Sequence, residues 1–74
     1  MNERTRGHIK WFDHQRRYGF IERENDLPDV FVHVNEFRSR TDVPWVRDGD
    51  AVEFEVERTP KGPSAADVVV LGTG

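Results

Sequence analysis

The sequence predicts an all-β domain folded as a small antiparallel barrel of five strands, and three observations lead to this prediction. Apolar and polar residues alternate with a period of two in five short runs of the 74-residue chain. Turn-forming segments separate the runs, and no segment carries the period of a long helix. Closure into a barrel is expected because it removes the exposed edges of an open sheet.

Three strands are expected in the first half of the chain. They are the runs TRGHIKWF (5–12), YGFIER (18–23) and DVFVHV (29–34), all rich in β-branched and aromatic residues. The segments DHQRR and ENDLP separate them, and the Asn25-Asp26 pair in the second segment is typical of a turn.

Two more strands are expected after a long connection at 35–49. They are DAVEFEVER (50–58) and SAADVVVL (64–71), separated by the turn-forming segment TPKGP. The fourth strand carries acids that we expect on its solvated side and away from any phosphate: Asp50, Glu53, Glu55 and Glu57. The last residues, 72–74, resemble a loose end.

Composition indicates one soluble domain over residues 1–74. Hydrophobic residues make up 35% and charged residues 34%, which is typical of a folded chain rather than a disordered one. Cysteine is absent, which excludes disulfides and thiolate metal sites and favours a reducing cytoplasm. Neither a signal peptide nor an apolar run of about 20 residues is found, so a cytoplasmic protein without a membrane segment is expected.

The charge distribution is uneven. A net charge of −3 argues against a nucleic-acid partner. However, residues 1–23 hold six Lys or Arg against three acids, and residues 24–74 hold five against eleven. This pattern indicates two electrostatically different faces, with chance clustering on a solvated surface as the alternative.

Four rings share one face of the second and third strands: Tyr18, Phe20, Phe31 and His33. The opposite face already offers an apolar core set, made of Ile21, Val30, Val32 and Val34. Because burial would leave the polar edges of Tyr18 and His33 without water, we expect the rings outside. Exposed rings beside cations are what a single-stranded nucleic acid requires, since bases stack on the rings and cations track the phosphates.

The runs GHIKWFD, RRYGFI, DVFVHV and KGPSAADV resemble the cold-shock domain family. Its motifs read roughly K-G-F-G-F-I, V-F-V-H-F and K-G-P-x-A-x-N-V, and the resemblance runs from about Gly7 to Leu71. It implies an OB-fold, the five-stranded oligonucleotide/oligosaccharide-binding barrel, which binds single-stranded RNA and DNA with a preference for pyrimidine-rich strands.

The resemblance also implies which residues contact the nucleic acid. The matching positions are Lys10, Trp11, Phe12, Tyr18, Phe20, Phe31, His33 and Lys61. Arg16 and Arg17 add two cations beside this set. Strict alternation puts Trp11 and Phe12 on opposite faces, so the presence of both at the site requires a bulge or twist.

Four positions depart from the family pattern. Arg17 stands in place of Gly, which costs about 1 kcal/mol if the backbone there has a positive φ. Val34 replaces Phe and removes one stacking platform. Tyr18 for Phe keeps the ring, whereas Asp67 for Asn has no interpretation from the sequence.

Three further residues carry specific expectations. Gly19, between two rings, indicates a close approach of another backbone. Phe37 is expected as a core plug after a one-turn helix that the resemblance implies. Two roles are possible for Trp45: it caps the barrel, or it extends the stacking surface.

No catalytic site, metal or cofactor is expected. The three histidines are spaced by six and nineteen residues, which matches no common zinc pattern, and neither serine has an evident base partner. The sequence thus favours a nucleic-acid chaperone that traps unpaired strands, with a protein-interaction module as the alternative. A monomer is expected, and a strand-swapped dimer stays open.

Overall fold

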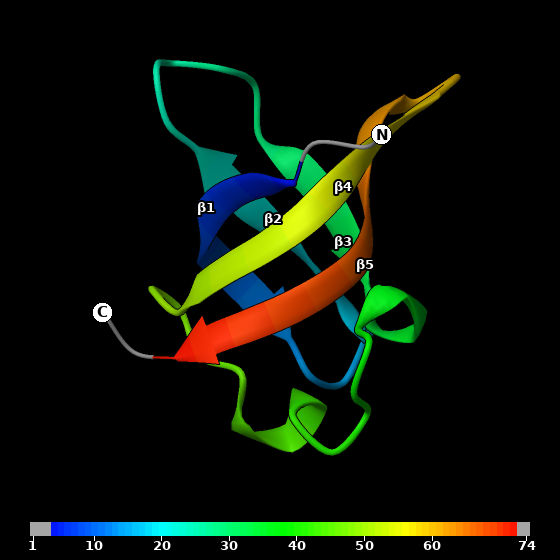
Figure 1. Ribbon diagram of the computed structural model, residues 1–74. Helices are drawn as coiled ribbons and strands as arrows, with labels where there is room; N and C mark the ends of the chain where they lie inside the picture. The colour runs from blue at the N-terminus through cyan, green and yellow to red at the C-terminus, as the bar shows by residue number, and fades with distance from the viewer. Residues whose placement is uncertain (1–3, 73–74) are drawn as a thin grey trace.

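The computed structural model describes residues 4–72, in which five strands form a closed barrel (Figure 1). The strands are β1 (Thr5–Asp13), β2 (Tyr18–Arg23), β3 (Val30–His33), β4 (Ala51–Thr59) and β5 (Gly62–Gly72). Two short 3₁₀ turns, η1 (Val34–Glu36) and η2 (Val43–Trp45), are the helical segments of this part of the chain. Within it, no helix has the length and apolar character to cross a membrane. The predicted all-β barrel is confirmed.

One junction of the barrel is parallel. The strand order is β1-β2-β3-β5-β4, and the pairs β1–β2, β2–β3, β1–β4 and β4–β5 are antiparallel. The closing pair, β3–β5, is parallel. An odd number of strands cannot alternate in direction all the way around a ring, so a five-stranded closed barrel must contain one such junction.

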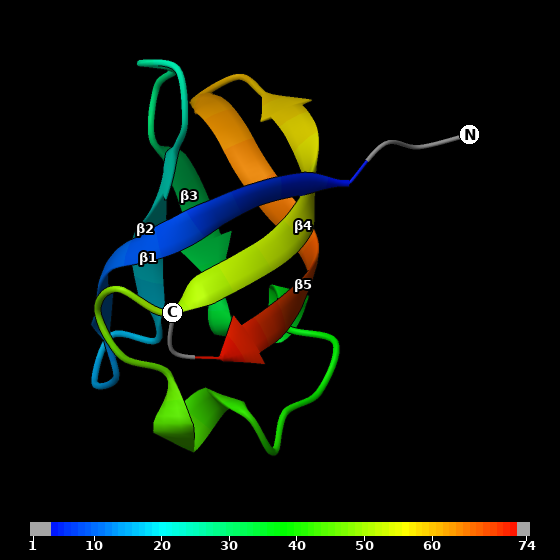
Figure 2. The same ribbon diagram turned by 60° about the vertical axis from the view of Figure 1, so that its left-hand side comes forward.

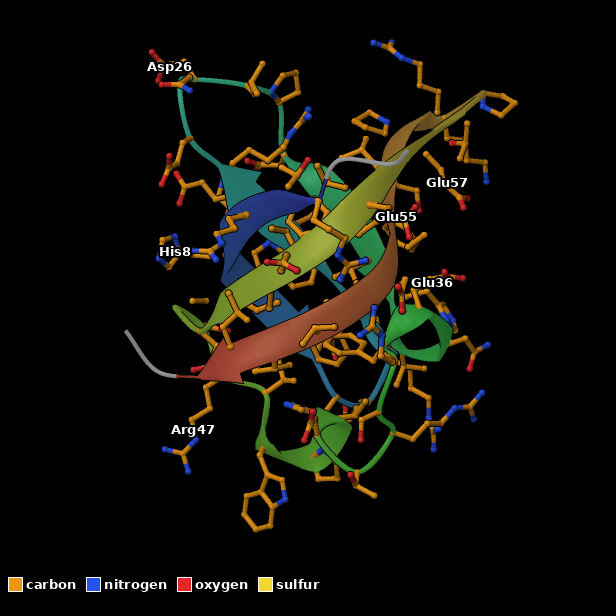
Figure 3. All side chains as sticks on the ribbon, in the orientation of Figure 1. His8, Asp26, Glu36, Arg47, Glu55 and Glu57 are labelled. Carbon is orange, nitrogen blue, oxygen red and sulfur yellow. The ribbon has the colours of Figure 1, made fainter. Side chains whose placement is uncertain are left out.

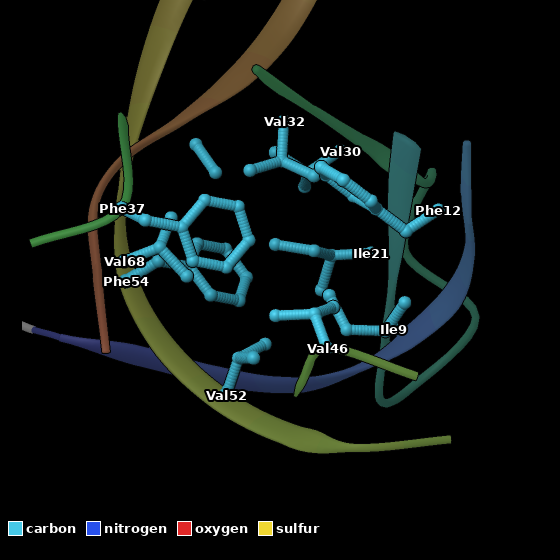
Figure 4. Close-up of a cluster of buried hydrophobic side chains, with 11 residues drawn as sticks. Ile9, Phe12, Ile21, Val30, Val32, Phe37, Val46, Val52, Phe54 and Val68 are labelled. Carbon is cyan, nitrogen blue, oxygen red and sulfur yellow. The ribbon is translucent and has the colours of Figure 1, made fainter. Parts of the chain in front are cut away.

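Side chains from all five strands fill the core. Figure 4 shows this cluster, which consists of Ile9, Phe12, Ile21, Val30, Val32, Phe37, Val46, Val52, Phe54, Ala65 and Val68. Val34, predicted as a core residue, is only partly buried and packs against the cluster. Phe37 follows η1 and is buried, as expected for a core plug.

Gly19 lies where β2 meets the backbone of β1. A Cβ at this position would overlap the carbonyl oxygen of Trp11 and would approach the Cα of Phe12 to 2.8 Å. The predicted close approach is confirmed, because no side chain fits between these two backbones.

The connections gather at two ends of the barrel. Figures 1 and 2 both place the β1–β2 turn and the long β3–β4 connection at one end, and the β2–β3 and β4–β5 turns at the other. At the carboxyl end of the described chain, Gly72 belongs to β5 instead of a loose end, and residues 73–74 lie outside the described residues.

The acids of β4 lie on its outer face, with one correction. β4 neighbours β1 and β5 rather than β2 or β3, and Figure 3 shows Glu55 and Glu57 pointing outward from it. Asp50, which we expected to be solvated, is only 5% exposed. Its carboxylate accepts a hydrogen bond from the backbone N–H of Arg47 at 3.0 Å, so it folds back onto the connection before β4.

An ionic network crosses the outer face of β1, β4 and β5. The Arg4 guanidinium lies 3.2 Å from a Glu53 carboxylate oxygen and 3.0 Å from one of Asp67. Arg38 donates to both Asp67 oxygens, at 2.9 and 2.7 Å. Asp67 has a φ of 50° at an irregularity in the β4–β5 pairing, a conformation that Asp and Asn tolerate. The side chain of Asp67 therefore suits this backbone conformation and adds an anion that two arginines neutralise.

The pKa of Asp67 generates the first prediction. The hydrogen bond from Arg38 lowers this pKa below its ordinary value of 3.8, with a smaller contribution from Arg4. A lowered folded-state pKa stabilises the protein above the ordinary value, and this contribution is lost as the pH falls through the folded-state value. Asp67→Asn should therefore be less stable than the parent at neutral pH, and the difference should shrink below about pH 4. Urea unfolding at both pH values measures this.

Asp26→Asn is the matched control, since Asp26 also has a positive φ, 58°, but no ion pair in the described chain. This control should show no comparable difference at neutral pH. Equal stability of the Asp67→Asn variant and its parent at neutral pH and low salt would contradict a stabilising network.

Candidate nucleic-acid interface

Aromatic side chains line the outer face of β2 and β3, as the alternation predicts. The register pairs Tyr18 with His33 and Phe20 with Phe31 across the two strands. The Phe31 ring centroid lies 5.6 Å from that of Tyr18 and 5.8 Å from that of Phe20. All four side chains are partly exposed, while the residues between them are buried. The prediction that the core forms on the opposite face is confirmed.

A bulge in β1 adds Trp11 to this face. The β1–β2 register shifts between Ile9 and Trp11, so Lys10 and Trp11 are consecutive exposed residues. The Trp11 ring lies 5.7 Å from Tyr18 and 5.3 Å from Phe20 between centroids. We use the name ring row for the resulting set, Trp11, Tyr18, Phe20, Phe31 and His33.

Phe12 does not join the ring row. The expected bulge is present, but it lies at Lys10 rather than between Trp11 and Phe12, so Phe12 points to the opposite side from Trp11. Its side chain is 9% exposed, and its ring meets that of Phe37 edge-on. Figure 4 shows Phe12 among the core residues. The expectation of both aromatic residues on the outer face is corrected, and we leave Phe12 out of the candidate interface.

Lys10 lies beside the ring row in an exposed ion pair. Its ammonium is 2.9 Å from a carboxylate oxygen of Asp29, just before β3. The hydrogen bond to Asp29 raises the pKa of Lys10, so the amine keeps its charge. No pattern in the sequence pointed to Asp29, because β1 and β3 are brought together by the register of β2.

A groove of about 490 Å³ opens at one end of the ring row. Phe20 and Phe31 line this groove together with Lys61 of the β4–β5 turn and Pro63 at the start of β5. Asp29 also lines this groove, and the Lys61 ammonium has no partner within residues 4–72. The predicted edge position of Lys61 is thus next to two of the rings.

Arg16 and Arg17 lie in the β1–β2 turn at the other end of the ring row. The Asp13 carboxylate accepts from the backbone N–H of Arg16 at 3.0 Å, which lowers the Asp13 pKa and fixes the turn. Arg16 lies beside Tyr18, whose phenol oxygen is the main group that raises the Arg16 pKa. Arg17 has a φ of 65°, so the left-handed conformation expected for the family's Gly is present with an Arg in it.

His33 has a role in the backbone as well as a place in the ring row. Its Nδ1 accepts a hydrogen bond of 3.1 Å from the N–H of Asn35 and so caps η1. In the neutral ring the proton then lies on Nε2, which is a hydrogen-bond donor. The alternation of exposed and buried residues along the strand did not predict this hydrogen bond.

Trp45 lies in η2 and is 73% exposed. It does not cap the barrel, and it makes no ring contact with the ring row in the described chain. No group of three or more His, Cys, Asp or Glu suited to a metal ion occurs among residues 4–72.

Known proteins resemble this chain over nearly its full length. Residues 5–71 match the family described as 'Cold-shock' DNA-binding domain. The chain is 40% identical over 68 residues to Cold shock-like protein CspE of Buchnera aphidicola subsp. Acyrthosiphon pisum, a match that covers 92% of this chain and 97% of the relative. It is 41% identical to Cold shock-like protein CspJ of Salmonella typhimurium (strain LT2), a match that covers 96% of this chain and 100% of the relative. For Cold shock-like protein CspE of Escherichia coli (strain K12), the identity is 38% with 92% and 97% covered.

The place of Trp11 in the ring row generates a fluorescence prediction. In a Trp45→Phe variant, Trp11 is the remaining tryptophan, and a base stacked beside it should quench its emission when oligo-T of about six nucleotides is added. A Trp11→Phe variant, which retains only Trp45, should change little. If a saturating oligonucleotide leaves the Trp11 emission unchanged, the interface is placed on the wrong face.

Proposed function

Because the chain belongs to the cold-shock domain family, we propose that it binds unpaired RNA or DNA on the ring row by base stacking. The observation that carries this proposal is the ring row itself, five partly exposed rings side by side on an outer face. The core is filled by other residues, so folding does not require these rings. A contiguous apolar patch exposed on a monomer indicates a binding surface. Nucleic-acid bases fit it because every base has a face that stacks.

Cations lie at both ends of the ring row, where Asp29 and Asp13 each pair with one of them, while the acids of the outer face of β4 and β5 lie elsewhere. Lys10 and Lys61 lie near Phe20 and Phe31, and Arg16 and Arg17 lie near Tyr18. Glu53 and Asp67 are paired with arginines on the outer face of β4 and β5. This separation supports binding of a polyanion by a chain with a net charge of −3.

The proposed activity is that of a nucleic-acid chaperone that works by mass action. A protein that binds unpaired strands and not paired ones shifts the melting equilibrium by RT ln(1 + [L]/Kd), where [L] is the free protein concentration. Neither a nucleotide cofactor nor a catalytic group is needed for this effect. A regulatory role in transcription or translation is a consequence that this proposal allows.

The proposal includes a preference for pyrimidine-rich strands, a monomeric state and a cytoplasmic location. The preference follows from the family, and the absence of cysteine supports a reducing compartment. Titration of oligo-T against oligo-A tests the preference.

A gel shift with oligo-T or oligo-U tests the function directly. A retarded complex that a duplex of the same sequence fails to form supports the proposal. The net charge of −3 favours one alternative, in which the ring row contacts a partner protein. Absence of any shift at micromolar protein would reject strand binding in favour of that alternative.

Truncation of one ring should weaken binding without unfolding the barrel. Phe31→Ala removes a stacking face that lies on the outer side of β3, so affinity for oligo-T should fall by about 1–3 kcal/mol. Calorimetric titration measures the affinity, and circular dichroism checks the fold. Trp45→Ala is the matched control, an exposed ring away from the ring row, and it should bind as the parent does. Unchanged affinity in a folded Phe31→Ala variant would exclude this ring from the interface.

The salt dependence should be shallow, because few cations lie near the ring row. Single strands give a slope of log K against log salt of about −0.7 per phosphate contact, so three or four contacts predict about −2 to −3. Arg17→Gly should reduce the slope by up to about 0.7, whereas Phe31→Ala should lower affinity at every salt concentration and leave the slope nearly unchanged. Arg47→Gln is a control for general charge. A steep slope that falls with the Phe31 change would show that charge rather than stacking carries the binding.

A further inference from the structure

A second hollow lies at the end of the barrel formed by the β1–β2 turn and the β3–β4 connection, the lower end in Figures 1 and 2. Its volume is about 360 Å³, within the range of pockets that hold small ligands. The lining residues are Phe12, His14, Arg17, Val34, Asn35, Arg40, Val43 and Pro44. We call this feature the end hollow, and the ring-row residues do not line it.

Part of the end hollow is lined by apolar side chains that contacts with the core hold in place. Val34, Val43 and Phe12 contribute side chains that belong to the core or pack against it. The His14 ring contacts Phe12 edge-on at 5.0 Å, and its Nε2 donates to the carbonyl oxygen of Val46 at 2.9 Å. These contacts give the end hollow a defined apolar surface on which a sugar or a base can pack.

Two unpaired guanidinium groups also line the end hollow. Neither the Arg17 nor the Arg40 side chain has a hydrogen-bond or ion-pair partner in the part of the chain that the structure describes. Arg4 and Arg38, in contrast, are both engaged by carboxylates. No acidic residue lines the end hollow. Two free arginines without a competing carboxylate favour an anion, and guanidinium groups match the geometry of phosphate.

The end hollow begins where the ring row ends. Arg17 immediately precedes Tyr18, and Val34 immediately follows His33. The N–H of Val34 donates to the carbonyl oxygen of Arg17 at 2.9 Å, which joins the two segments at the rim. The end hollow therefore borders the ring row, so a strand that lies along the ring row can extend into it.

We propose that the end hollow binds the terminal phosphate of a single strand together with its nucleotide, an inference that rests on the proposed function. A terminal phosphate is a monoester with a charge of about −1.5 to −2, whereas an internal phosphodiester carries a single charge. The higher charge and the additional free oxygens of the monoester suit two guanidinium groups. The protein then distinguishes phosphorylated strand ends from hydroxyl ends.

Calorimetric titration of three oligo-T strands of equal length tests this, with a 5′-phosphate, a 3′-phosphate or neither. We expect one phosphorylated strand to bind about five- to tenfold more tightly than the plain strand, and the better end identifies the polarity of the bound strand. The readout is the ratio of phosphorylated to plain affinity, because a general loss of charge weakens all three strands alike.

Arg40→Gln should bring this ratio close to one, whereas Arg47→Gln should keep it. Arg47 is the matched control, since it lies on the same connection with its side chain pointing to solvent and does not line the end hollow (Figure 3). As an independent readout, thymidine 5′-monophosphate should shift the backbone amide signals of Arg17, Asn35 and Arg40 in NMR spectra.

The outcomes separate this inference from the proposed function. Tight binding of all three strands with equal affinity overturns the terminal-phosphate site and leaves the ring row in place. A gain that falls equally with Arg40→Gln and Arg47→Gln reflects diffuse charge and also overturns the inference. If no strand binds, the proposed function fails and the inference fails with it.

Discussion

The interface depends on how a closed barrel divides side chains between its two sides. Successive residues of a strand face opposite ways, so a β-branched core set such as Val30 and Val32 fixes which neighbours remain outside. Phe31 and His33 are outside because the interior is already filled. The close packing of Gly19 against β1 brings Trp11 beside Tyr18 and Phe20. The ring row is thus a consequence of core packing.

Local sequence patterns predict the strands and the core well, because both depend on the alternation within a segment. The predicted runs agree with the observed strands to within two residues, whereas the burial of Phe37 was expected from the family resemblance and not from alternation. What the patterns miss depends on register between strands. The bulge lies one residue earlier than the resemblance required, so Phe12 is buried. The pairing of Lys10 with Asp29 requires three strands to be placed together, and the burial of Asp50 requires the fold of the preceding connection.

Ion pairing determines how much of the protein's charge is left without a neighbouring opposite charge. Arg4 and Arg38 neutralise Glu53 and Asp67, which reduces the negative potential that the acids would otherwise project. Arg17 and Arg40 have no such partners within residues 4–72, so no paired carboxylate offsets the positive potential that they project. Net charge alone is therefore a poor guide to partners in this chain, because it does not distinguish cations that are paired with carboxylates from cations that are not.

The parallel junction between β3 and β5 has a consequence for the order in which the chain assembles. β1, β2 and β3 are sequence neighbours that pair in succession, and β4 and β5 form a hairpin of their own. Among the strand pairs of the described barrel, β1–β4 and β3–β5 join segments that are distant along the chain. Since loop closure delays such long-range pairings, we expect the two local units to form first and the barrel to close last. The ring row lies wholly on the first unit, so its rings are brought together before the barrel has closed.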